Sequence, residues 1–250
     1  LFDVPSYAQI NTFEIRLVSN NDGDDFFDWI AGAWYEDVER GFSFFGEHVG
    51  PAATPFGVPV TDGFVYDDVI QVEPSQELAF YGELSMHFTD QATLTLGYRR
   101  SDVEVDLDVL RAEGAFDAFF ASQIGLDQKV QEDVNTYKAN FEYTLNEDVL
   151  LYALASSGYR AGGFNRANPN VGLPASSYGS DTLWNYELGA KTSWLDGRLI
   201  ANATIYQIDW SDIQLTKEEF GSSGSSFITA NFGKAKVDGV ELEVDYRIME

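Results

Sequence analysis

Apolar and polar residues alternate one by one along much of the chain. Between Trp184 and Trp194 the even positions are largely apolar, whereas the odd positions are polar or glycine. A period of two is that of a β-strand whose two faces meet different surroundings. The stretch begins and ends in tryptophan and its polar face carries charges. This is typical of a strand with lipid on one side and a water-filled lumen on the other.

The same alternation recurs in ten segments, which we expect to be strands arranged as five hairpins. They are residues 7–19, 26–38, 77–88, 91–106, 133–145, 149–163, 182–195, 198–214, 227–235 and 238–248. The last two contain Gly233 and Gly239, and together they could form one long strand with a bulge or a tight turn. The pattern therefore predicts nine or ten strands.

The connections between these segments alternate between short and long. Asp196-Gly197 is a strong signal for a two-residue hairpin, because both turn positions require positive φ. The other short connections are 20–25, 89–90 and 146–148, and the long ones are 39–76, 107–132, 164–181 and 215–226. Short turns at one end and long loops at the other are typical of outer-membrane barrels. We therefore predict an all-β fold, an antiparallel transmembrane β-barrel.

Periodicity alone does not tell which face of the strands lies inside, because a soluble barrel with an apolar interior gives the same alternation. The aromatic residues at the strand ends and the loop pattern favour lipid on the outside. We therefore expect Tyr186, Leu188 and Ala190 to face lipid, and Glu187 and Lys191 to face the lumen.

Composition narrows the classes of protein. With 41 acidic and 15 basic residues the net charge is −26, which excludes a nucleic-acid-binding protein. Aromatic residues make up 15% of the chain, which suits a protein with rings at two membrane–water boundaries. There is no cysteine, so disulfides and thiolate sites are excluded. No stretch reaches the roughly 20 apolar residues that a transmembrane helix needs.

Several motifs carry a family resemblance. In the second half they are residues 151–165 (LYALASSGYRAGGFN), 185–191 (NYELGAK), 199–209 (LIANATIYQID), and 231–235 (NFGKA) followed by 239–243 (GVELE). Near the start they are residues 13–19 (FEIRLVS) and 27–32 (FDWIAG). Together they resemble strands of TonB-dependent outer-membrane receptors. The resemblance covers most of the chain except the long loops.

The resemblance implies a barrel of about 22 strands whose lumen is closed by a separate plug domain. At most ten strands are present, so residues 1–250 would form a partial barrel, part of the TonB-dependent receptor β-barrel domain. The plug domain, a signal peptide and the C-terminal closing strand have no match in this sequence. The chain begins at Leu1 without an initiator Met, and we expect it to be an internal segment of a longer protein.

By the same resemblance, the intact protein would lie in the cell outer membrane and take up a scarce nutrient, such as an iron–siderophore complex, with energy from TonB. Its partners would be outer-membrane lipid, TonB through the absent plug segment, and a small-molecule ligand such as an iron chelate. Two alternatives stay open, namely a passive porin-like channel and a soluble ligand-binding β-barrel. A plug domain upstream in the full-length gene would separate the receptor from the porin.

Residues for catalysis or metal binding are scarce. His48 and His87 are the two histidines, no HExxH run occurs, and we expect no enzymatic activity, resident metal or cofactor. His87 is interpreted as a polar residue facing the lumen. The acidic alternation over 102–108 spaces successive carboxylates by about 6.6–6.8 Å, too far for one compact cation site, so we interpret it as a solvated face. The Gly/Ser run 221–226 is interpreted as a flexible loop.

Ligand contacts are expected near the outer rim, where polar and aromatic groups can capture an incoming solute. The candidates are Arg160, Asn165, Tyr178 and Trp210. For Trp210 we prefer a second interpretation, as a residue of the aromatic girdle at the membrane surface. Nothing in the sequence names the substrate.

Overall fold

The computed structural model describes residues 2–3, 6–20, 26–47, 65–114, 128–165, 167 and 171–248. Within these ranges nine long strands form one antiparallel sheet. They are β2 (Ser6–Val18), β3 (Phe27–Glu47), β4 (Val65–Thr89), β5 (Ala92–Gly114), β6 (Gln128–Asn146), β7 (Val149–Arg160), β10 (Asp181–Trp194), β11 (Leu199–Gly221) and β12 (Gly224–Tyr246). Three short strands complete the set: β1 (Phe2–Asp3), β8 (Gly163–Asn165) and β9 (Ser176–Tyr178). Among the described residues there is no helix that is long and apolar enough to cross a membrane.

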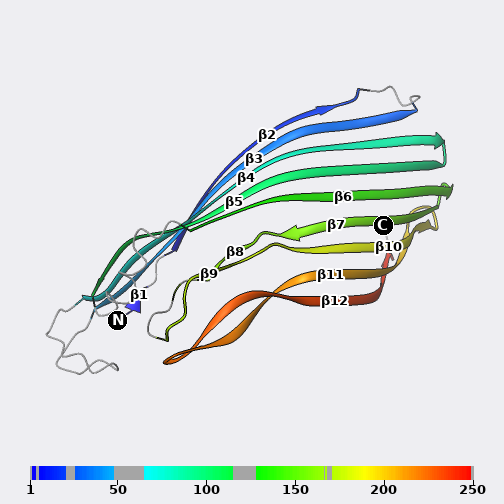
Figure 1. Ribbon diagram of the computed structural model, residues 1–250. Coiled ribbons are helices and arrows are strands. Elements are labelled where there is room, and N and C mark those ends of the chain that lie inside the picture. The colour runs from blue at the N-terminus through cyan, green and yellow to red at the C-terminus, as the bar shows by residue number, and fades with distance from the viewer. Residues whose placement is uncertain are drawn as a thin grey trace.

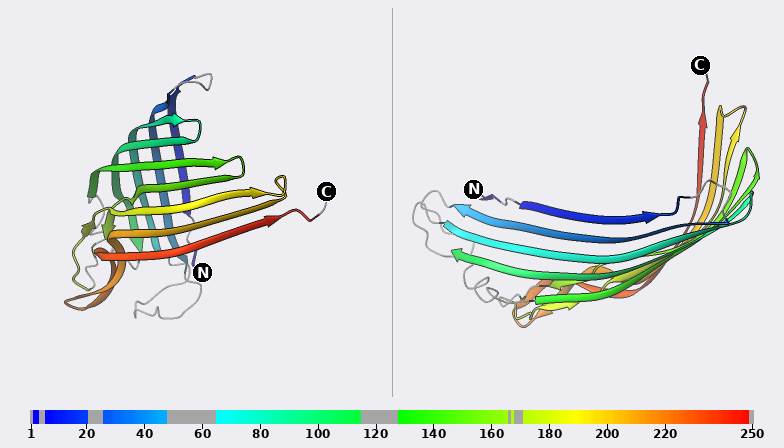
Figure 2. Two further views of the ribbon diagram at one scale, coloured as in Figure 1. Left: turned by 90° about the vertical axis from the view of Figure 1, so that its right-hand side faces the viewer. Right: turned by 90° about the horizontal axis from the view of Figure 1, so that it is seen from above.

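Each long strand pairs with its neighbour in the sequence, from β2 at one edge to β12 at the other. The short strand β1 pairs with the far end of β3, and β8 pairs with β9 outside the main sheet. Figure 1 shows the strands running side by side, with the short turns gathered at one end. Figure 2 shows that the sheet curves into an open trough, as a section of a barrel wall would. The all-β prediction and its partial barrel are confirmed.

The predicted strands 227–235 and 238–248 form one strand, β12, which settles the count of long strands at nine among the described residues. Gly233 interrupts this strand with φ of +34° and lies across from Asp212, whose φ is +55°. The hairpin is therefore kinked, but it is not divided. At the other end of the sheet Asp196 and Gly197 both have positive φ, as the hairpin signal predicted.

The predicted long loops are wrong in extent, because the strands continue well past their predicted ends. β11 runs to Gly221 and β12 starts at Gly224, so the predicted loop 215–226 is largely a hairpin with a turn at 222–223. β3 and β4 likewise extend into 39–76, and β5 and β6 into 107–132. Backbone pairing continues through these extensions, and it does not require an apolar alternation of the side chains. The predicted strand 149–163 instead ends at Arg160, before β8.

The strand register places apolar and polar residues on opposite faces. One row of directly opposed residues on the apolar face consists of Phe27, Met86, Leu94, Phe141, Ala153, Leu188, Ile205 and Val240. Large side chains on this face remain exposed, for example Leu188 at 57% and Leu242 at 76%. We call the apolar part of this face the apolar band; on β10 it extends from Trp184 to Trp194.

The apolar band crosses the strands obliquely. Its outer edge lies at Tyr35 on β3, before Asp37, and at Val240 on β12, before Asp238. The row of opposed residues from Phe27 to Val240 crosses seven strand-to-strand steps. On β3 the outer edge of the band lies eight residues beyond this row, whereas on β12 it coincides with the row, so the edge shifts by eight residues over seven steps. At about 3.3 Å per residue and about 4.8 Å per step, this corresponds to a strand tilt of roughly 40°. Strands of transmembrane barrels have such a tilt.

Side chains on the polar face reach past a neighbouring strand to the strand beyond it. Bridges of this kind among the described residues are Tyr81 to Glu14 over Gly32, Lys138 to Glu83 over Gly97, and Tyr152 to Thr204 over Gly189. The glycine on the middle strand leaves room for the crossing side chain. Because side chains converge on the concave side of a curved sheet, we assign the polar face to the inside of the wall.

Candidate functional site

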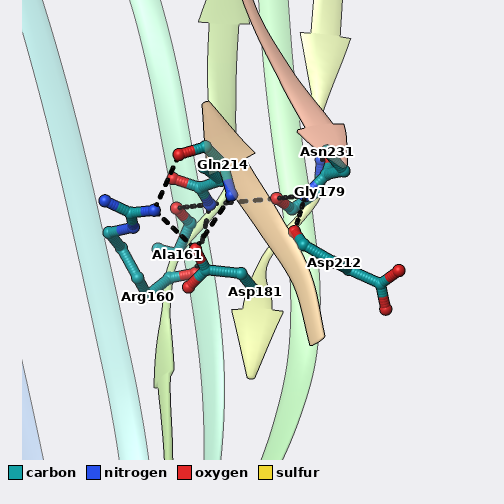
Figure 3. A network of polar contacts seen from close by, with 7 residues as sticks. All are labelled: Arg160, Ala161, Gly179, Asp181, Asp212, Gln214 and Asn231. Carbon is teal, nitrogen blue, oxygen red and sulfur yellow. Dashed lines mark hydrogen bonds and ion pairs between the residues drawn. The ribbon is translucent and has the colours of Figure 1, made fainter. Parts of the chain in front are cut away.

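Beyond the apolar band, at the end of the long connections, the strands form what we call the outer rim. Its described residues are 37–47, 65–77, 99–114, 128–136, 158–165, 167, 171–182, 207–221 and 224–238. Here β6 and β7 separate, since their pairing ends at Lys138 and Ser156. The small β8–β9 sheet lies beyond β7, and polar side chains of β6, β11 and β12 hold it. Figure 3 shows the central part of this network.

Asp181, at the start of β10, is the centre of the rim network. Its side chain is 3% exposed, and its Oδ2 lies 2.5 Å from Nη2 of Arg160. The same oxygen accepts a hydrogen bond from the backbone N–H of Gln214 at 3.1 Å. Two donors therefore compensate one buried carboxylate, which ties the end of β7 and the start of β10 to β11.

Gln214 and Asn231 hold the backbone of the connection between β7 and β10. Nε2 of Gln214 donates to the carbonyl oxygens of Ala161 at 2.8 Å and Gly179 at 3.0 Å (Figure 3). The amide of Asn231 bonds both backbone groups of Gly179, at 2.8 Å to its N–H and 2.9 Å to its carbonyl. It also donates to the carbonyl of Asp212, at the kink of the hairpin. Side chains thus replace the strand pairing that is missing here.

Glu132 and Asn165 secure the two sides of the β8–β9 sheet. The carboxylate of Glu132, on β6, accepts hydrogen bonds from the N–H groups of Ser180 at 2.9 Å and Gly162 at 3.4 Å. Asn165 pairs with the backbone of Thr229 on β12 through two bonds of 2.7 Å. The β8–β9 sheet is therefore fixed between β6 and β12.

The structure places all four sequence-derived ligand candidates at this rim, in two pairs. Arg160 lies over Trp210, with its guanidinium carbon 5.5 Å from the ring centroid. Asn165 and Tyr178 belong to the β8–β9 sheet, where Tyr178 covers Gly163 so closely that no Cβ would fit there. The amide of Asn165 is engaged with the backbone, whereas the side chain of Arg160 remains 52% exposed.

Trp210 lies opposite Leu183, on the face away from Trp184. Its interpretation as a lipid-facing girdle residue is therefore wrong. A ring on the inner face meets the lumen, where it packs against Arg160 instead of lipid. Its Nε1 is buried and has no hydrogen-bond partner among the described residues.

Below the rim, the inner face contains a hollow of about 540 Å³. Its charged and aromatic lining on this face comprises Glu14, Arg16, Trp34, Tyr81, Glu83, Arg99 and Lys138. Most of these charges are used within the wall: Lys138 pairs with Glu83 at 2.9 Å. Neither Arg16 nor Glu14 has an ion pair among the described residues, so the hollow retains one cation and one anion outside its ion pairs.

Glu77, on β4 just outside the apolar band, forms a second buried polar cluster. Its carboxylate lies 2.6 Å from Nη2 of Arg99 and accepts a hydrogen bond from Ser101 at 2.7 Å. Burial raises the pKa of this carboxyl, but the hydrogen bonds from Arg99 and Ser101 and the charge of Arg99 lower it more. The net pKa lies below its ordinary value, so Glu77 is ionised at neutral pH.

The remaining sequence candidates take no part in the network around Asp181. His87 lies near the short-turn end of the inner face, with Nε2 2.9 Å from Asp28 and Nδ1 3.0 Å from Thr93. In the acidic alternation of β5, Asp102 accepts a hydrogen bond from Gln131, and Glu104 forms an ion pair with Lys129; both partners are on the neighbouring strand β6. His48 lies outside the described residues.

Sequence reasoning missed the residues that build the rim, namely Glu132, Asp181, Gln214 and Asn231. Each bonds backbone groups at least 19 residues away in the chain, or a side chain on another strand. Their spacing therefore carries no local signal. Asn231 belongs to a motif that was noted for its family resemblance, but nothing in that motif indicates its partner Gly179.

Comparison with known proteins gives a consistent result. A family model described as TonB dependent receptor-like, beta-barrel, matches residues 3–249. The pesticin receptor of Yersinia enterocolitica is 31% identical over 173 residues, which are 69% of this chain and 24% of that protein. The ferric-pyoverdine 358 receptor of Pseudomonas putida is 23% identical over 176 residues, 70% of this chain and 20% of that protein.

Solved structures agree on the fold. The ferric yersiniabactin uptake receptor FyuA from Yersinia pestis superposes with a TM-score of 0.69 at 21% identity, covering 99% of this chain and 34% of that one. The ferripyoverdine receptor of Pseudomonas aeruginosa superposes with a TM-score of 0.64 at 16% identity, covering 100% of this chain and 32% of that one. The chain spans between a fifth and a quarter of the length of the curated relatives cited above. It belongs to the TonB-dependent receptor family of the outer membrane and represents a section of that family's β-barrel.

Proposed function

We propose that this chain is the wall section of a receptor that takes up an iron–siderophore complex across the outer membrane, with energy from TonB. The family match over residues 3–249 carries the proposal. It is supported by relatives named as receptors for pesticin and for ferric pyoverdine. In this proposal the plug domain, which contacts TonB, lies in a part of the protein outside this sequence. The receptor binds and moves its ligand without catalysing a reaction.

The test is uptake of radioactive iron by cells that depend on the full-length receptor. Ferric yersiniabactin and ferric pyoverdine serve as probes, because relatives are named for them or for their uptake. Saturable uptake that stops when TonB is deleted would support the proposal. Uptake that persists without TonB and rises linearly with concentration would contradict it and favour a passive channel.

Within this function, we propose Arg160 as a ligand contact at the rim. Its side chain is half exposed, and among the described residues its hydrogen bonds are made by Nη2 alone. The other guanidinium nitrogens are available for an anionic oxygen of a metal chelate, and the ring of Trp210 positions them. One charge-assisted hydrogen bond contributes about 1.5–3 kcal/mol. We therefore expect Arg160→Ala to weaken ligand binding roughly 10- to 100-fold.

The matched control for Arg160→Ala is Arg198→Ala, at the short-turn end of the wall, which should bind ligand as the wild type does. Because Arg160 also bonds Asp181, hydrogen exchange of residues 176–181 must be measured in both variants. A loss of binding without faster exchange there supports direct contact. Equal binding by Arg160→Ala and the wild type would remove Arg160 from the site.

A further inference from the structure

Tyr206, on the inner face of β11, lies opposite Gly239 of β12, and its ring covers that glycine. A Cβ at Gly239 would lie 2.3 Å from Cζ of Tyr206 and 2.4 Å from its hydroxyl oxygen. On its other side Tyr206 lies opposite Glu187, on β10. Its hydroxyl forms no hydrogen bond with Glu187 or with any other residue that the structure describes. The side chain therefore points across β12, away from β10.

Tyr152, on β7, has the same arrangement but with a strand on its far side. It lies opposite Gly189, on β10, and a Cβ there would lie 2.3 Å from its ring. Its hydroxyl passes over β10 and lies 2.9 Å from Oγ1 of Thr204, on β11. Thr204 is the residue that faces Gly189 from that side. The ring thus covers the glycine, and the hydroxyl reaches the strand beyond.

Tyr81, on β4, repeats this arrangement in the other half of the sheet. It lies opposite Gly32, on β3, with its hydroxyl 2.5 Å from the position of a Cβ. The hydroxyl donates a hydrogen bond to Glu14, on β2. Glu14 lies two residues from Arg16, which faces Gly32, in the direction of the outer rim. In both cases the strand beyond the glycine supplies an oxygen acceptor, at the level of the glycine or two residues toward the rim.

For Tyr206 the corresponding strand would lie beside the free edge of β12. Figure 1 shows β12 at this edge of the sheet. On the inner face of β12 the neighbours of Gly239 are Val237, on the side of the rim, and Glu241. Val237 has no acceptor, and the hydroxyl does not bond Glu241. In the barrel of this family the edge must be paired with another strand, because unpaired backbone groups are too costly in lipid.

We propose that the barrel strand paired with the free edge of β12 carries a hydrogen-bond acceptor for Tyr206 on its inner face, opposite Gly239 or Val237. The acceptor is a carboxylate or hydroxyl side chain, as in Glu14 and Thr204. A slip of this strand by one residue would move the acceptor to the outer face, so the bond fixes the register where this section of the wall meets the next. The bridge depends only on the barrel and is independent of what the receptor takes up.

The first test is unfolding of the full-length receptor by denaturant in lipid vesicles. Tyr206→Phe removes only the hydroxyl, and it should lower the equilibrium constant for folding roughly three- to tenfold. Tyr152→Phe, which loses its bond to Thr204, should show a loss of the same size. Tyr186→Phe is the matched control, because this hydroxyl lies on the apolar face and has no hydrogen bond within the described part of the chain. Heat-modifiable migration on gels checks that each variant is folded.

Disulfide cross-linking then locates the acceptor, since residues 1–250 contain no cysteine of their own. Val237→Cys is combined with single cysteines along the neighbouring strand, and the fastest cross-link identifies the residue opposite Val237. The residue opposite Gly239 follows two positions along. The acceptor found there is replaced by valine or leucine, alone and together with Tyr206→Phe. We expect this replacement to lower the folding constant of the wild type about threefold more than that of Tyr206→Phe.

An apolar residue or glycine at both positions would overturn the proposal. So would a Tyr206→Phe variant as stable as the Tyr186→Phe control, because water in the lumen would then satisfy the hydroxyl. If Tyr206→Phe is destabilised but its effect adds fully to that of the second replacement, the hydroxyl bonds another part of the receptor, such as the plug, and the proposal fails.

Discussion

The apolar band and the outer rim belong to the same strands but are held together differently. In the band, eight strands share one continuous row of paired residues, from Phe27 to Val240, and its large side chains face outward. At the rim, by contrast, the buried apolar side chains lie on the inner face of the sheet. A small buried cluster lies on the inner side, formed by Val38, Ala79, Val103 and Val134, and the β6–β7 pairing is absent. Side-chain amides and carboxylates replace it.

This difference follows from the two solvents. In lipid, every backbone N–H and C=O group must be paired within the sheet, so the band requires an uninterrupted ladder of backbone hydrogen bonds. At the rim, water can satisfy the backbone, so strands can part and single residues such as Asp181 decide how the segments are joined. The band should therefore respond to changes of polarity and shape, and the rim to the loss of individual hydrogen bonds.

The largest expected effect is that of a charge in the middle of the band. Ala190 lies on the apolar face about midway between Trp184 and Trp194. Ala190→Arg should lower the free energy of unfolding in lipid vesicles by about 2–4 kcal/mol, since the guanidinium would enter hydrocarbon. Leu154→Arg, on the inner face beside Glu187, should cost less than about 1 kcal/mol. Equal costs for the two variants would contradict the assignment of the faces.

A smaller effect is expected where a side chain crosses a glycine. A Cβ at Gly189 would lie 2.3 Å from the ring of Tyr152, so Gly189→Ala must displace that ring and break its bond to Thr204. We expect a loss of about 1–3 kcal/mol in denaturant unfolding. Gly82→Ala is the control, because a Cβ there meets its nearest atom at an ordinary 3.5 Å. If both substitutions are neutral, the bridges over glycine contribute nothing to stability.

At the rim the expected effect is local. Asn165→Ala removes two bonds to the backbone of Thr229, each contributing about 0.5–1.5 kcal/mol. Hydrogen exchange of the Thr229 amide and of residues 176–178 should accelerate, while the global unfolding transition stays in place. Asn135→Ala, which removes one bond from Tyr98, should leave this exchange unchanged. A shift of the global transition instead would mean that rim and band unfold as one unit.

The smallest effect concerns pH. The pKa of Glu77 is lowered in the folded state, so its contribution to stability is present above its ordinary value of 4.5 and is lost as the pH falls further. Glu77→Gln should therefore destabilise the rim at pH 6, measured by hydrogen exchange, and the two proteins should converge in strong acid. Glu147→Gln, in an exposed short turn, should show no such difference. A gap between Glu77→Gln and wild type that widens in acid would refute the ionised pairing.

The same contrast explains how much of the structure the sequence predicts. The alternation within the band, for example at Trp184–Trp194, follows from lipid on one side and water on the other, and the strands there were predicted to within a few residues. The outer halves of β11 and β12 have water on both faces and lose that alternation, which is why 215–226 was misread as a loop. Partners such as Gln214 and Gly179 are joined only by the fold.

Among the site candidates, location was easier to predict than role. Arg160, Asn165, Tyr178 and Trp210 all follow or precede a predicted strand end, and all lie at the rim. The sequence did not show that the amide of Asn165 would pair with a backbone, because Thr229 is 64 residues away. It also did not show which face Trp210 occupies, since the phase of a strand near its end depends on the register with its neighbour.

The shift of eight residues over seven strand steps also determines how large a closed wall must be. Continued at this rate through the about 22 strands implied by the family resemblance, it would accumulate to a shear number of about 25. A cylinder with that strand number and tilt is roughly 40 Å across between opposite backbones. Wall side chains cannot fill such a diameter. A closed wall of this diameter would leave an open channel unless a folded domain occupied the lumen, so the tilt of the strands bears on the plug domain that the family resemblance implies.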